Sequence, residues 1–261
     1  MAVDATGDIG AAKVSLTSPV PTSHVIYDDL IVGDGPAVRE AAQSVVGVMT
    51  LLSGTTGQVL QTGAVIWSPE KMDELLGAGG AALECATEGS RVAFAIPAAD
   101  LPEGMADQAG LDAQGSLVGS IDIQTVLLPK AEGRDVFNDA RGLPTVVRAP
   151  DGRPGIIIPD TTAPKKVVTQ TLIAGDGAKV GDSTAMFNYT AVAWADRTVS
   201  GSSWESGVVY DAATLPKQVM DQVAKATVGS QLLVVVPDDN GAATAYVVDV
   251  LGILPPDLVR G

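Results

Sequence analysis

The chain has 261 residues, of which 46% are hydrophobic but only 4% aromatic, and it carries a formal net charge of −15. This composition excludes intrinsic disorder and fits one large globular domain or two of modest size. The negative charge argues against a nucleic-acid partner, because binding to phosphates requires clustered lysine and arginine. A single cysteine and a single histidine exclude an intrachain disulfide, a zinc site and a serine–histidine triad in each half, so we expect no metal and no cofactor.

The sequence predicts neither a membrane span nor a signal peptide. No apolar stretch approaches the roughly 20 residues that a spanning helix needs. Residues Met1–Asp4 lack the basic and apolar regions of a secretory signal. We therefore expect a cytoplasmic protein, unless a signal has been removed.

Residue types predict short strands with one short helix in each half of the chain. The helices place Leu83 and Val223 on an inner face. Each helix is followed by Gly-Ser and an apolar run ending in proline, which is typical of a helix that stops before a buried strand. The predicted elements are strand 44–52, helix 80–86, strand 91–97, strand 116–128, a hairpin over 143–159 with an Asp-Gly turn, strand 185–194, helix 219–226, strand 231–237 and strand 244–251.

Two sequence landmarks occur twice in the same order. The Leu30–Gly35 segment recurs as Leu172–Gly177, and Gly89–Pro97 recurs as Gly229–Pro237. The offsets are nearly equal, at 142 and 140 residues, and far too long for a solenoid repeat. The spacing predicts a duplicated domain, with a lead-in at 1–23, domain 1 at 24–130, a linker with a small hairpin at 131–165, domain 2 at 166–254 and a tail at 255–261.

The second half resembles the FKBP family of peptidyl-prolyl cis–trans isomerases, and the first half shows the same skeleton with weaker matches. The tandem form resembles exported actinobacterial members, which favours the cell envelope or extracellular space if a signal was removed. The landmarks, in order, are Gly175–Gly177, Tyr189–Trp194, Ser202–Trp204, Val228–Ser230, Val234–Pro237 and Val248–Leu251. The resemblance implies an α+β fold, in which each of two FKBP-like domains is an antiparallel sheet wrapped around one short helix.

The resemblance also implies a reaction that needs no metal, acid or nucleophile. Rotation about an X–Pro bond crosses a barrier of roughly 18–20 kcal/mol because of amide resonance. An apolar, largely aromatic pocket lowers the barrier by removing water from the amide, since the twisted amide has less charge separation than the planar one.

In domain 2, most of the pocket aromatics implied by the family are replaced. Tyr189 matches the family tyrosine, although a strand tyrosine can equally be a core residue with a bonded hydroxyl. Leu215 and Pro216 compete for the position of the family isoleucine, whose N–H holds a substrate carbonyl; Pro216 has no N–H. The remaining candidate pocket residues are Ser200 and Gly201 in place of Phe-Asp, Val219 in place of tryptophan and Val247 in place of the last-strand phenylalanine.

In domain 1, the family pattern retains no pocket aromatic, and Trp67 has no assigned counterpart. The candidate pocket residues are Met49 at the tyrosine position, Leu60 and Gln61 at the Phe-Asp positions, Leu76 and Gly79 within the segment that replaces Val-Ile-Pro-Gly-Trp, and Gly119 at the last-strand phenylalanine position. Because only domain 2 keeps the tyrosine, we expect any residual isomerase activity there.

Three functions follow from these replacements. The chain is a weak prolyl isomerase, a non-catalytic module that binds proline-containing or apolar peptide segments of client proteins, or a structural assembly subunit built from FKBP-like modules. The missing aromatic walls favour the second, a chaperone-like folding factor. The oligomeric state is left open by the sequence.

Overall fold

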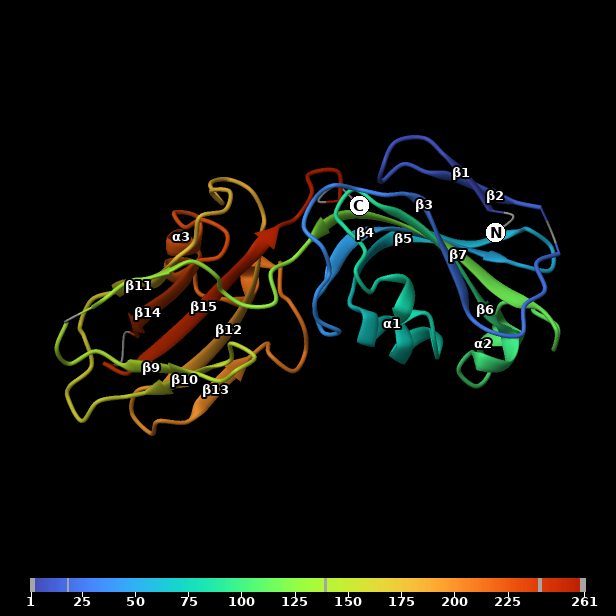
Figure 1. Ribbon diagram of the computed structural model, residues 1–261. Coiled ribbons are helices and arrows are strands. Elements are labelled where there is room, and N and C mark those ends of the chain that lie inside the picture. Colours follow the sequence, from blue (N-terminus) through green and yellow to red (C-terminus); the bar gives the residue numbers. More distant parts are fainter. Residues whose placement is uncertain (1–2, 18, 139, 239–240, 259–261) are drawn as a thin grey trace. The chain divides into compact units, whose positions relative to one another are not determined.

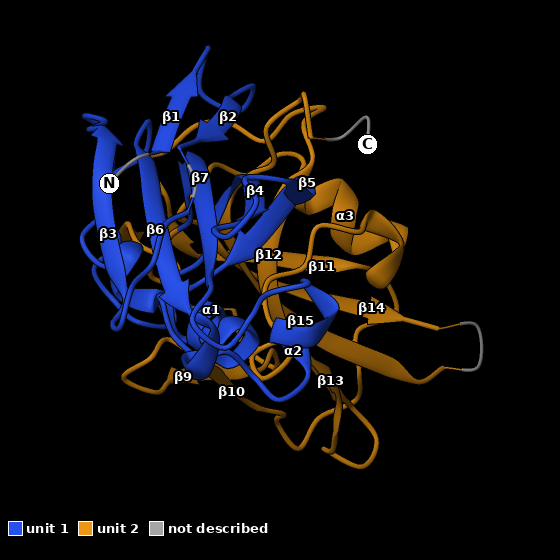
Figure 2. Cartoon of the chain, turned by 90° about the vertical axis from the view of Figure 1, so that its right-hand side faces the viewer, with its two compact units in different colours: residues 1–127 blue, residues 128–261 orange. Residues whose placement is uncertain are grey.

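The structure, a computed structural model, describes residues 3–17, 19–138, 140–238 and 241–258. The chain divides into two compact units, Met1–Leu127 (unit 1) and Leu128–Gly261 (unit 2), coloured separately in Figure 2. Antiparallel strands dominate both units and the helices are short, which confirms the predicted α+β class at this level. The finer division at residues 24, 131, 166 and 255 stays a prediction. Within the described ranges, no helix is long and apolar enough to cross a bilayer.

Unit 1 is built on a 5-stranded antiparallel sheet with the order β3-β6-β7-β4-β5. A separate hairpin, β1 with β2, precedes the sheet. The elements are β1 (Val3–Thr6), β2 (Lys13–Leu16), β3 (Ile26–Ile31), β4 (Val45–Ser53), β5 (Val59–Trp67), α1 (Pro69–Leu76), the 3-10 helix η1 (Gly80–Ala82), β6 (Arg91–Pro97), η2 (Ala98–Asp100), α2 (Met105–Gln108) and β7 (Ser116–Val126).

Unit 2 contains a 6-stranded sheet with the order β13-β12-β15-β14-β11-β8, so β14, β15, β12 and β13 match β6, β7, β4 and β5. A hairpin of β9 with β10 turns through Ala149–Arg153. The elements are β8 (Arg134–Asp135), β9 (Thr145–Arg148), β10 (Pro154–Ile157), β11 (Val168–Ala174), β12 (Ala185–Ala193), β13 (Val199–Ser202), η3 (Ala212–Thr214), α3 (Lys217–Val223), β14 (Gln231–Pro237) and β15 (Ala243–Ile253).

Both faces of each central sheet are covered. In unit 1, Val92, Phe94 and Ile96 of β6 face the helix side, while Ala93 and Ala95 face the β1–β2 hairpin. Figure 1 shows α1 and this hairpin on opposite sides of the sheet. Because successive strand residues point to opposite faces, burial on both faces requires an uninterrupted apolar run. The sequence of β6 supplies that run.

Unit 2 repeats this arrangement with different covering segments. Leu232 and Val234 of β14 face α3, while Leu233 and Val235 face the β9–β10 hairpin. Val146 and Ile156 of that hairpin pack on the same cluster, and so does Trp194. A hairpin before β3 in unit 1 and before β11 in unit 2 therefore covers the second face of the sheet.

The sequence repeat recurs as a repeated hydrogen-bond pattern. In unit 1, Gly33 N–H donates to Ser90 Oγ at 2.9 Å and Thr87 Oγ1 donates to Gly33 O at 2.8 Å. In unit 2 the matching bonds of Gly175 measure 3.2 Å to Ser230 and 2.7 Å from Thr227. A Cβ at either glycine would lie 2.1 or 2.2 Å from a backbone oxygen, so only glycine permits the approach.

The predicted helix over 80–86 is wrong. Only Gly80–Ala82 form a short 3-10 turn, and the α-helix of unit 1 lies earlier, at Pro69–Leu76. Ser68 caps this helix by accepting the Lys71 N–H, proline occupies its first turn, and Gly77 ends it in the left-handed conformation, with φ 78°. These are the usual start and stop signals, whereas the later segment has only helix propensity. Leu83 is nevertheless fully buried, and the second predicted helix overlaps α3, with Val223 buried.

Candidate functional site

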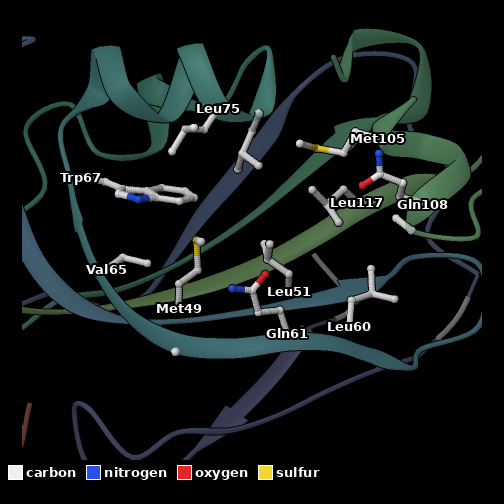
Figure 3. A pocket seen from close by; sticks show the side chains of 13 residues that line it. Met49, Leu51, Leu60, Gln61, Val65, Trp67, Leu75, Met105, Gln108 and Leu117 are labelled. Carbon is white, nitrogen blue, oxygen red and sulfur yellow. The ribbon is translucent and has the colours of Figure 1, made fainter. Parts of the chain in front are cut away.

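An open groove of about 450 Å³ lies in unit 1 between the β4–β5 strands and the helices α1 and α2 (Figure 3). Strand alternation builds its floor, because Met49 and Leu51 lie two residues apart on β4 and project to the same face. Across the sheet, Met49 is opposite Gly63 and Leu51 is opposite Gln61. The lining residues are Met49, Leu51, Leu60, Gln61, Gly63, Val65, Trp67, Leu75, Leu76, Met105, Gln108, Ala109 and Leu117.

The lining of this groove is apolar and uncharged. Figure 3 shows the flat indole of Trp67 at one end, with Leu75 above it and the Met49 sulfur beside it. The polar side-chain groups of the lining are the amides of Gln61 and Gln108 and the indole N–H of Trp67. Such a surface can bind apolar side chains and remove water from a peptide amide, and its methionines can adapt their shape. No lining residue can act as a general acid, base or charged nucleophile.

The structure brings four of the six residues predicted for unit 1 into this groove: Met49, Leu60, Gln61 and Leu76. Gly79 does not line it; a Cβ there would contact Ile96 and Met72, and its φ of 108° requires glycine. The position is therefore a backbone turn against the core.

Gly119 also lies outside the groove. A Cβ on Gly119 would lie 2.1 Å from Cζ of Phe94, its cross-strand partner. Phe94 is fully buried, so its ring occupies the space that a side chain at 119 would need. The Phe94 ring thus fills the core space beside Gly119.

Sequence analysis did not assign Trp67 to the pocket, although it is the groove's aromatic residue. Gln61, Gly63, Val65 and Trp67 all line the groove at alternate positions of β5. A strand prediction over 59–67 would have placed Trp67 on the same face as Gln61.

In unit 2, Tyr189 and Gly201, two of the candidate pocket residues, lie close together. Gly201 on β13 is opposite Ala191 on β12, just as Gln61 on β5 is opposite Leu51 on β4 in unit 1. A Cβ on Gly201 would lie 3.3 Å from the Tyr189 hydroxyl oxygen. The ring of Tyr189 also lies 6.5 Å from that of Phe187, and Ser200 is exposed.

The other unit 2 candidates are core residues or lie elsewhere. Leu215 and Val219 are buried in the cluster beneath α3, and Pro216 immediately precedes that helix. Val247 belongs to the cluster on the opposite face of the sheet, while Tyr246 faces the α3 side. The predicted placement of Val247 is therefore off by one residue, which reverses the face in a strand.

A buried ion pair ties the sheet of unit 1 to its N-terminal segment. Arg91 is fully buried, and its guanidinium donates to both carboxylate oxygens of Asp122 at 2.6 and 2.9 Å. These bonds raise the pKa of Arg91 above its usual value. The remaining guanidinium donors bind the carbonyl oxygens of Ala5, Gly7 and Asp8.

Unit 2 has a neutral amide at the matching position. Gln231 is opposite Asp249, as Arg91 is opposite Asp122. Gln231 Nε2 donates to Asp249 at 2.7 Å, and its Oε1 accepts from Arg148 of the β9–β10 hairpin at 2.8 Å. Burial raises the pKa of Asp249 to about 6, although the bonds from Gln231 and the Ala131 N–H oppose the shift.

Among the residues that the structure describes, no group of three or more histidine, cysteine, aspartate or glutamate side chains is arranged to hold a metal ion.

No protein-family model and no curated protein matches the sequence. Among solved structures, the chain is similar to the three FKBP domains of wheat FKBP73, with 14% identity, coverage of 88% of this chain and 94% of that chain, and a TM-score of 0.35. It is also similar to a peptidyl-prolyl cis-trans isomerase from Pseudomonas syringae pv. tomato, with 19% identity, coverage of 41% and 77%, and a TM-score of 0.32. The first neighbour consists of FKBP domains, and the second is a peptidyl-prolyl isomerase.

Proposed function

We propose that this protein binds extended apolar peptide segments, including proline-containing ones, in the groove of unit 1, and that it acts as a folding factor with weak or no isomerase activity. The observation that carries the proposal is the uncharged lining of the groove, with Trp67 at one end, Met49 on its floor and Met105 on the α2 side. An indole face and flexible thioethers suit a proline ring or a leucine side chain.

Weak catalysis follows from the openness of this site. The amide must lose its water for the rotational barrier of about 18–20 kcal/mol to fall appreciably. Leu60 is 38% exposed and Gln61 is exposed, so this wall of the groove leaves a bound amide in contact with solvent. We therefore expect measurable peptide binding with little acceleration of X–Pro isomerisation.

The test is binding of the capped peptide acetyl-Ala-Leu-Pro-Phe-amide to the full chain, followed by calorimetry and by amide NMR shifts. Trp67→Ala removes the largest apolar surface of the groove, so we expect the affinity to fall about tenfold, which corresponds to about 1.4 kcal/mol. Val59→Ala is the matched control, because Val59 lies on the same strand but outside the lining.

Exchange spectroscopy on the same peptide measures its cis–trans rate, which we expect to rise only slightly with the protein present. Equal peptide affinity in wild-type protein and the Trp67 variant would refute the groove as the binding site. Isomerisation as fast as that of an intact FKBP would contradict the weak-catalysis part alone.

A further inference from the structure

The two units differ at one edge of their sheets. Leu30 and Leu172 are matching repeat positions, so β3 and β11 are equivalent strands. In unit 2 the outer side of β11 is paired with β8, and the Val136 N–H donates to Leu172 O at 2.9 Å. In the described part of unit 1, no strand pairs with the outer side of β3, which forms the margin of the sheet in Figure 2.

Side-chain exposure follows this difference. Ile31 of β3 is 39% exposed, while the matching Ile173 of β11 is only 7% exposed. A Cβ on Gly229 would lie 2.2 Å from the Glu132 carbonyl oxygen, whereas a Cβ on the matching Gly89 would meet only Gly33 Cα at 3.4 Å. The segment that leads into β8 therefore fills a space that is open beside β3.

Charge indicates what can fill that space. Unit 1 contains 16 acidic and four basic side chains, a net of −12, whereas unit 2 has 15 acidic and 12 basic ones, a net of −3. Of the four cations of unit 1, Arg91 is buried and already paired. Asp29 on β3 and Asp34 just after it are exposed. Pairing of β3 with a second copy would bring these carboxylates together, which disfavours a homodimer through this edge.

We propose that the outer edge of β3 accepts an extended, lysine- or arginine-rich segment of a partner protein as an added antiparallel strand. The open main-chain groups of the edge supply hydrogen bonds, as those of β11 do for β8 in unit 2. Basic side chains of the partner pair with Asp29 on one face of the added strand, and its apolar ones pack on the other face beside Ile31, which is 39% exposed. This site is separate from the groove, which lies on β4 and β5 toward the opposite edge of the sheet.

The probe is a capped hexapeptide of alternating lysine and valine, titrated into the full chain and followed by amide NMR. We expect saturable shifts in residues 26–33 and an unchanged Trp67 indole signal. A glutamate–valine hexapeptide tests charge, and a lysine–proline hexapeptide tests the ladder, because proline has no N–H to donate. Neither should bind.

Two charge reversals on exposed residues complete the test. Asp29→Lys should weaken the lysine–valine peptide about fivefold to tenfold, with less effect as salt is raised. Glu70→Lys makes the same change in net charge on α1, which packs on β5 at the opposite edge of the sheet, and should weaken it less than about twofold. Shifts confined to other strands, equal binding of the glutamate peptide, or self-association of the chain through β3 would each overturn the proposal.

Discussion

In both units an arginine links the sheet to the segment that covers it, but the arginine belongs to the sheet in unit 1 and to the hairpin in unit 2. Each sheet carries a buried aspartate and needs a hairpin fixed over one face. In unit 1 an arginine of the sheet, Arg91, reaches outward to the carbonyl oxygens of the N-terminal segment. In unit 2 an arginine of the hairpin, Arg148, reaches inward to Gln231. The buried charge in unit 1 is therefore paired directly, while Asp249 in unit 2 is held by an amide and a backbone N–H.

The units also differ at the helix-facing site. The sequence predicts that any residual isomerase activity resides in unit 2 because it keeps Tyr189, but the apolar groove lies in unit 1. In unit 2, Leu215 and Val219 are 4% and 0% exposed and belong to the core under α3. The presence of Tyr189 is thus a weaker guide to an open site than the burial of Leu215 and Val219.

Removing each buried carboxylate gives the largest expected contrast. Asp122→Asn leaves the Arg91 guanidinium buried without a counter-ion, so we expect unit 1 to lose about 3–5 kcal/mol of unfolding free energy. The equivalent Asp249→Asn should change unit 2 by less than about 1 kcal/mol, because it also removes a poorly solvated charge. Hydrogen exchange of β7 and β15 amides measures each unit in the full chain. Equal losses of unfolding free energy in the two variants would contradict the expectation that pairing with Arg91 makes Asp122 the more important carboxylate.

The raised pKa of Asp249 predicts a pH dependence for unit 2. The folded chain holds this proton up to a pKa of about 6, whereas an exposed aspartate releases it near pH 4. The folded state therefore binds more protons in this window, and its stability decreases as pH rises from about 4 to about 6, by about 2–3 kcal/mol. The unfolding free energy from hydrogen exchange of β15 amides, measured in wild type and in Asp249→Asn at each pH, isolates this contribution as the difference between the two. A difference that does not vary with pH would contradict it.

Glycine substitutions give the smallest contrast. A methyl group at Gly119 overlaps the fully buried Phe94 ring, so Gly119→Ala should cost about 1–3 kcal/mol. Gly201→Ala meets the end of the Tyr189 side chain, at 3.3 Å from its hydroxyl oxygen and 3.4 Å from Cε2, and should stay within about 0.5 kcal/mol. Thermal unfolding of both variants measures the two effects. A neutral Gly119 variant would mean that Phe94 can move out of the core position.

The fold is predictable where local signals are strong. The repeated Gly-Ser segment and the apolar run after it locate β6 and β14, because a strand covered on both faces must be apolar throughout. Helix α1 was predictable from Ser68, Pro69 and Gly77, but the alanine-rich segment after it has a competing helix propensity. Propensity is the weaker signal, since a cap satisfies specific backbone groups.

The site is less predictable because it depends on register between distant strands. Met49, Leu60, Gln61 and Leu76 line one groove, and their role in binding stays a prediction. Which of Tyr246 and Val247 faces α3 depends on the pairing of β15 with β14, and a one-residue difference reverses it. Charge pairing was equally hidden, because Arg91 and Asp122 are 31 residues apart.

The bonds that hold Gly33 and Gly175 have a consequence for the order of folding. The Gly33–Ser90 bond spans 57 residues and the Gly175–Ser230 bond spans 55. Closing a loop costs entropy that grows only with the logarithm of its length, about 0.6 kcal/mol per doubling, so the two closures are nearly equal in cost. Closure of this loop therefore costs nearly the same in the two units, although they differ in charge, cover and open surface, and we expect it to contribute little to any difference in their folding rates.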